Sequence, residues 1–117
     1  MALYLILGIT KDVCMLESVQ PQCLKNEVLL MNVATYGRMR IGRCITAKEI
    51  HAIGSHFGEN PRYLGCSADV LSILDRKCSG KTECQIRLSD IPDDNIQPCF
   101  PGLKMYLEIS YRCVSSK

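Results

Sequence analysis

Eight cysteines constrain the fold of this chain more than any other feature. Their number is even, and no two stand in the Cys-x-x-Cys arrangement typical of zinc ribbons and thioredoxin-like redox sites. Disulfide bonds are therefore the favoured interpretation, and free structural thiols the weaker alternative. Because disulfides persist in oxidising compartments, they predict a protein that works outside the cytosol. Spacing alone does not choose a pairing among Cys14, Cys23, Cys44, Cys66, Cys78, Cys84, Cys99 and Cys113.

The composition fits one small domain and argues against two classes of partner. The chain has 117 residues, a net charge of +2 and 22% charged residues. Such a balance predicts neither nucleic-acid binding nor membrane insertion, and the absence of Trp argues against a base-stacking platform. The apolar start, "MALYLILGI", is too short to span a bilayer and lacks the flanks of a complete signal peptide. We interpret residues 1–11 as a lead-in strand or a leader remnant.

Three segments have the pattern of strands. Residues 27–36, "EVLLMNVATY", are apolar on both faces, which is typical of a buried strand. Strict alternation would place Ala34 and Tyr36 on one face of it, and Leu29 and Met31 on the other. Residues 84–90 and 104–114 alternate more cleanly, with Ile86 and Leu88 inward in the first and Met105, Leu107, Ile109, Tyr111 and Cys113 inward in the second.

Two segments have helical signals. Residues 46–57 begin with a capping box, Thr46 and Glu49, and residues 67–78 begin with Ser67 as a plausible N-cap. Gly80 is a suitable residue just past the end of the second helix. The sum predicts an α+β fold: a small disulfide-rich domain with an antiparallel β-sheet sandwich and one or two helices packed on it.

Cysteine spacing and two short motifs together resemble a known family. Eight residues separate Cys14 from Cys23, twelve separate Cys23 from "YGR" at 36–38, and five separate Cys78 from Cys84. The ending "QPCFPGLKMYLEISYRC" is similar to the pattern D-P-C-P-G-x-x-K-Y-L-x-V-x-Y-x-C. On these motifs residues 12–117 resemble the sea-urchin-egg-lectin type domain, which binds galactose or rhamnose and also occurs in latrophilin-type adhesion receptors.

The resemblance implies both a disulfide pairing and a sugar site. The implied bonds are Cys14–Cys44, Cys23–Cys113, Cys66–Cys99 and Cys78–Cys84. The implied carbohydrate contacts, by position or by nearest equivalent, are Tyr36, Gln97, Gly102, Lys104 and Glu17. In the family, an aromatic ring lies along the sugar, while ionised side chains bond its hydroxyls.

This sequence departs from the family at three of those contacts. Met15 stands where the family has Glu after the first cysteine, and the nearest carboxylate is Glu17. Gln97 replaces the Asp of "DPC". Met105 replaces the Lys of "KYL", with Lys104 one place earlier, and neighbouring strand residues face opposite sides.

Other polar residues receive structural interpretations. The stretch 34–44, "ATYGRMRIGRC", should form the end of a core strand and a turn that leads to a disulfide-bonded Cys44. Gly37 should serve a turn or close packing of the backbone. Arg38 should pair with a loop acid such as Asp93 or Asp94. Arg40 and Arg43 should belong to a solvated strand end, with contact to an anionic glycan or sulfate as the alternative. His51 and His56 have the wrong spacing for a shared metal, and the acids at 90–94 lack the pattern of a calcium loop.

The resemblance implies a non-enzymatic binding module without a cofactor, secreted or part of a larger ectodomain. One hypothesis is recognition of a galactose- or rhamnose-like sugar, with a glycan or glycoprotein as partner. The alternative is a protein–protein module on the same scaffold whose sugar site is lost. Tyr36 accordingly either borders a sugar pocket or covers the sheet.

Overall fold

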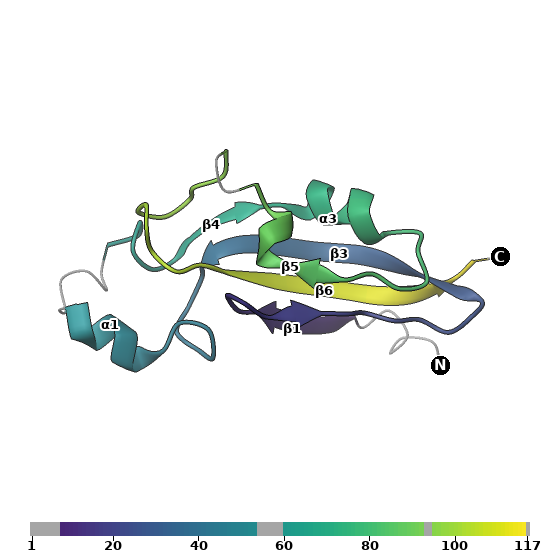
Figure 1. Cartoon of the computed structure of the whole chain (residues 1–117), viewed down its shortest axis with the longest axis horizontal. Coiled ribbons are helices and arrows are strands. Elements are labelled where there is room, and N and C mark those ends of the chain that lie inside the picture. The colour runs from purple at the N-terminus through teal and green to yellow at the C-terminus, as the bar shows by residue number, and fades with distance from the viewer. Residues whose placement is uncertain (1–7, 54–59, 93–94, 117) are drawn as a thin grey trace.

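A four-stranded antiparallel sheet forms the framework of the protein. The computed structural model describes residues 8–53, 60–92 and 95–116, with only the backbone of 51–53. The strand order is β1 (Ile9–Val13), β6 (Tyr106–Ser115), β3 (Glu27–Arg38) and β4 (Cys66–Asp69), so the two longest strands are central. A second sheet pairs β2 (Ser18–Val19) with β5 (Ile86–Arg87). Helix α3 (Leu71–Cys78) lies along β3, and helix α1 (Ala47–Ile53) lies at one end of the molecule (Figure 1).

A bulge in β3 decides which side chains reach the core. Met31 pairs with Tyr111 and Val33 with Ser110, so Asn32 is an extra residue without a cross-strand partner. An extra residue reverses the inside–outside phase of a strand. The expected face assignment from strict alternation is therefore wrong beyond this point. The buried face of β3 is formed on both sides of the bulge by Leu29, Met31, Ala34 and Tyr36.

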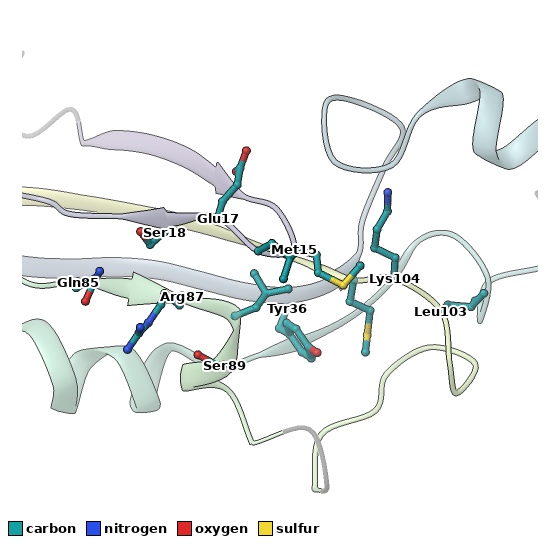
Figure 2. Close-up of a pocket in the computed structure, with 12 residues that line it drawn as sticks. Met15, Glu17, Ser18, Tyr36, Gln85, Arg87, Ser89, Leu103 and Lys104 are labelled. Carbon is teal, nitrogen blue, oxygen red and sulfur yellow. The ribbon is translucent and has the colours of Figure 1, made fainter.

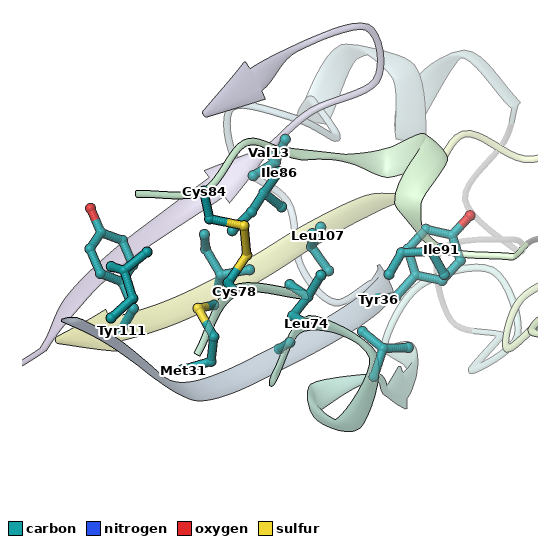
Figure 3. Packing of buried hydrophobic residues seen from close by; sticks show 14 residues of the cluster. Val13, Met31, Tyr36, Leu74, Cys78, Cys84, Ile86, Ile91, Leu107 and Tyr111 are labelled. Atoms are coloured by element: carbon teal, nitrogen blue, oxygen red, sulfur yellow. A yellow bond between two sulfur atoms is a disulfide. The ribbon is translucent and has the colours of Figure 1, made fainter. Parts of the chain in front are cut away.

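The main core lies between this face of the large sheet and the layer formed by α3 and β5 (Figure 3). Leu74 of α3, Ile86 of β5, and Leu107 and Ile109 of β6 are all fully buried. The inward alternation expected for residues 104–114 places Leu107, Ile109 and Tyr111 correctly, whereas Met105 and Cys113 are only partly buried. Tyr106, which alternation directs to the opposite side, is also buried, in a second cluster. The predicted α+β fold class is confirmed.

The helix expected at 67–78 begins later than the sequence suggested. Ser67 lies in β4, where it pairs with Gly37, so its assignment as an N-cap is wrong. The helix begins at Leu71, whose N–H donates to Asp69 Oδ1 at 2.9 Å. Gly80 follows the helix end with φ +89°, the left-handed conformation that suits glycine there.

The capping signal of the other helix is correct. The Glu49 N–H donates to the Thr46 hydroxyl at 3.3 Å, and that hydroxyl donates to the Glu49 carboxylate at 3.1 Å. Helix α1 is described from Ala47 to Ile53, and the rest of the predicted segment, with His56, lies outside the described residues.

The strand expected at 84–90 is much shorter. Only Ile86 and Arg87 pair as a strand, and Leu88–Asp90 form a 3₁₀ turn, η2. Asp90 Oδ2 accepts the Arg87 N–H at 2.8 Å and ends the strand there. Leu88 is only partly buried in this turn.

Four disulfide bonds link Cys14 to Cys44, Cys23 to Cys113, Cys66 to Cys99 and Cys78 to Cys84. This is the pairing that the family resemblance implies. Among the described residues, no helix is long and apolar enough to cross a membrane, and no group of three or more His, Cys, Asp or Glu could hold a metal.

Candidate binding site

A pocket of about 580 Å³ opens where three segments meet beside Tyr36 (Figure 2). The segments are the turn between β1 and β2, the end of β5 with η2, and the stretch that leads into β6. Its volume lies within the range of small-molecule sites. The lining residues are Met15, Leu16, Glu17, Ser18, Tyr36, Gln85, Arg87, Leu88, Ser89, Leu103, Lys104 and Met105.

Three of the five predicted sugar contacts line this pocket, and two do not. Tyr36, Glu17 and Lys104 belong to the lining, whereas Gln97 and Gly102 are exposed and stand outside it. Tyr36 is only 3% exposed because its ring packs into the main core. It therefore both covers the sheet and forms part of the pocket wall.

Glu17 is bound within its own turn. Its Oε1 accepts the Cys14 N–H at 3.0 Å, and its Oε2 pairs with Arg43 at 2.5 Å. Arg43 also donates to the carbonyl of Asp12 at 2.5 Å. The Arg43 hydrogen bond, and then the Cys14 N–H, hold the pKa of the Glu17 carboxyl below its ordinary value of 4.5. Both carboxylate oxygens thus brace the turn that forms one side of the pocket.

This bracing should depend on pH with a definite sign. Because the pKa of Glu17 is lower in the folded state than in the unfolded state, its bonds are complete above pH 4.5 and are lost as the pH falls through the lowered value. In an acid titration followed by NMR, we expect the Cys14 amide signal to shift with a midpoint below 4.5, and the Glu17→Gln variant to lack that shift. A midpoint at or above 4.5 would contradict the pairing.

Lys104 is held from two directions. Its ammonium pairs with Glu49 of α1 at 2.9 Å, and its carbonyl accepts a hydrogen bond from Arg38 at 2.5 Å. Figure 2 shows the charged ends of Glu17 and Lys104 directed away from the Tyr36 ring. Neither of these charged groups is therefore presented freely to a ligand.

Arg38 anchors the stretch of chain that forms the pocket wall next to β6. Only 3% exposed, it donates to the carbonyls of Tyr63 at 2.6 Å and Lys104, and its guanidinium lies 4.8 Å from the centre of the Tyr63 ring. A cation in this position is stabilised by the ring face and by both carbonyls. Its suggested partners, Asp93 and Asp94, lie outside the described residues.

The other two arginines of this segment are exposed and ion-paired, Arg40 with Glu108 and Arg43 with Glu17. As members of the sugar site, Met15 and Met105 were interpreted from the sequence as losses from the family pattern. Both methionines line the pocket, and so does Arg87, which the sequence did not single out. The apolar wall could have been predicted from the sequence, because Met15 and Met105 stand where the family has charged residues.

Comparison with known proteins agrees with this architecture. The model of the D-galactoside/L-rhamnose binding SUEL lectin domain matches residues 21–113. The chain belongs to this lectin domain family. The match includes Tyr36, Arg87 and Lys104 but begins after Met15 and Glu17.

Curated relatives share the domain within longer chains. The chain is 32% identical to Protein eva-1 homolog C of Pan troglodytes and 31% identical to that of Homo sapiens, over 104 residues in each case. The aligned part is 89% of this chain but 22% of each relative, so the chain spans about a fifth of their length. Membership of this lectin domain family indicates a binding module rather than an enzyme.

Proposed function

We propose that this domain is an extracellular, non-enzymatic module that binds a neutral sugar of the galactose or rhamnose type in the pocket beside Tyr36. The composition of the lining carries this proposal: apolar side chains and neutral polar ones surround the hollow, and two of its three charged residues, Glu17 and Lys104, are ion-paired within the fold. A monosaccharide has the same two-sided character, because its C–H groups form an apolar face and its hydroxyls form a polar rim. The four disulfides support the extracellular location.

The two methionines replace charge with an adaptable apolar wall. Met15 and Met105 are flexible and polarizable, so they can cover the C–H face of a sugar. Ser18, Gln85 and Ser89 remain to exchange hydrogen bonds with hydroxyls. Such neutral bonds are weaker than charge-assisted ones, so each site should bind weakly and gain strength when several are linked.

A titration with galactose and with L-rhamnose tests the sugar site directly. In NMR spectra of the methionine methyl groups, we expect the Met15 and Met105 signals to shift with added sugar, in fast exchange and with millimolar affinity. Met31 is buried, only 4% exposed, and does not line the pocket, so its methyl signal is the internal control. Sugar binding is refuted if neither pocket methionine shifts at high millimolar concentration, or if Met31 shifts equally.

A protein ligand is the second candidate, because one large apolar side chain at the mouth of the pocket is fully exposed. That residue, Leu16, is 99% exposed.

A further inference from the structure

The turn that forms one side of the pocket displays two apolar side chains, Met15 and Leu16, which we call the lip. Leu16 is 99% exposed and Met15 is 49% exposed. A single exposed leucine is ordinary on a protein surface. Leu16, however, also has φ +70°, a left-handed conformation that a bulky residue rarely adopts. Its backbone is thus held against its own preference, a feature that is concentrated at functional sites.

Covalent and ionic contacts hold the lip in place. The Cys14–Cys44 disulfide fixes its start, and the Glu17 N–H donates to the Cys14 carbonyl at 3.1 Å. The Glu17 carboxylate adds the bonds to the Cys14 N–H and to Arg43. The backbone of a turn held in this way has little conformational freedom left to lose when a partner covers the lip, which favours binding.

A cation lines the same pocket as the lip. Ser18, two residues after Leu16, pairs with Arg87 in the β2–β5 ladder, so Arg87 lies at the same mouth of the pocket. Arg87 is exposed, and no ion pair of its guanidinium is found in the part of the chain that the structure describes. The other charged lining residues, Glu17 and Lys104, are paired internally. The charge offered to a partner here is therefore positive.

We infer that the lip and Arg87 form a docking surface for an extracellular protein. The contact segment of this partner places an aliphatic or aromatic side chain against Met15 and Leu16, and an aspartate or glutamate against Arg87. A guanidinium binds a carboxylate through two parallel hydrogen bonds, which gives orientation as well as affinity. A symmetric contact between two copies of this chain through the lip would bring two Arg87 side chains together, so charge favours a different, acidic partner.

The test uses phage-displayed random peptides selected on the folded, disulfide-bonded domain, followed by titration of the selected peptides. We expect enrichment of sequences that carry Asp or Glu next to Leu, Ile or Phe. Leu16→Asn and Arg87→Gln should each weaken the selected peptides roughly tenfold, as for central contacts of an interface. Asparagine tolerates the left-handed turn, so Leu16→Asn removes apolar surface without opposing the backbone.

Leu24→Asn is the matched control, because Leu24 is 74% exposed and does not line the pocket. Peptide binding to this variant should equal that to the unmodified domain. The inference is overturned if acidic–apolar sequences are not enriched, or if Leu16→Asn binds the peptides as well as Leu24→Asn. It is also overturned if the unmodified domain self-associates in sedimentation and Leu16→Asn abolishes this, since the lip would then belong to a second copy. No sugar enters these measurements, so their failure is distinct from failure of the sugar titration.

Discussion

Replacing Cys23 and Cys113 together by alanine is expected to lower the free energy of unfolding by about 4–5 kcal/mol. The bond joins residues 90 positions apart and ties the segment before β3 to the last strand, β6. Without it, the unfolded chain gains the freedom that closure of this long loop removes. Urea unfolding should therefore show a lower free energy and a higher m-value, because the unfolded chain also exposes more surface.

The Cys78–Cys84 bond is the comparison. Its cysteines are only 6 positions apart, so the entropy of loop closure predicts a stabilisation of only about 2 kcal/mol. Both cysteines are buried, at 0% and 7% exposure, so alanine replacement here also removes core contacts. This loss narrows the difference in free energy of unfolding between the two variants. The m-value separates the two effects, because only the long loop changes the size of the unfolded chain appreciably. An equal rise in m-value for both variants would contradict the loop argument.

The features that the sequence predicted well are local ones. The Thr46–Glu49 capping box and the glycine after α3 depend on residues a few positions apart, and their physical requirements are visible in the sequence. The inward alternation of Leu107, Ile109 and Tyr111 in β6 is also local, because no extra residue interrupts this strand between them. The disulfide pairing was implied by family resemblance, since spacing alone allows many pairings.

The features that the sequence missed depend on partners that are distant along the chain. Nothing near Asn32 marks it as a bulge, because the extra residue is defined only by its pairing with β6. Ser67 has the type of a helix N-cap, yet pairing with Gly37 draws it into a strand. At Ser67 a tertiary contact overrides a local preference that is worth only about 1 kcal/mol.

The candidate site shows the same division. Sequence and resemblance together identified Tyr36, Glu17 and Lys104, which the structure brings to one pocket. They did not reveal that Glu17 and Lys104 are paired with Arg43 and Glu49, 26 and 55 positions away. Whether these two charged groups are available to a ligand therefore depends on the fold. The fold is also what gathers Met15, Met105 and Arg87 around one pocket.

Gly37→Ala is expected to destabilise the domain by about 3 kcal/mol or more, because there is no space for a β-carbon. A Cβ at this position would lie 2.2 Å from the carbonyl oxygen of Cys66 and 2.8 Å from the Cα of Ser67. Both are backbone atoms of β4, which the Cys66–Cys99 bond restrains, so neither can turn aside as a flexible side chain would. The strand pairing itself must open, next to Tyr36 and the pocket.

Gly42→Ala is the matched control for this prediction. A Cβ there meets no atom within 4 Å, so alanine should change the free energy of unfolding by no more than about 0.5 kcal/mol. Urea unfolding of the two variants measures the difference, and hydrogen exchange should show the loss concentrated at the β3–β4 ladder of Gly37→Ala. Equal stability of the two variants would mean that β3 and β4 do not approach each other as closely as described, and the wall of the pocket formed by Tyr36 would then need a different support.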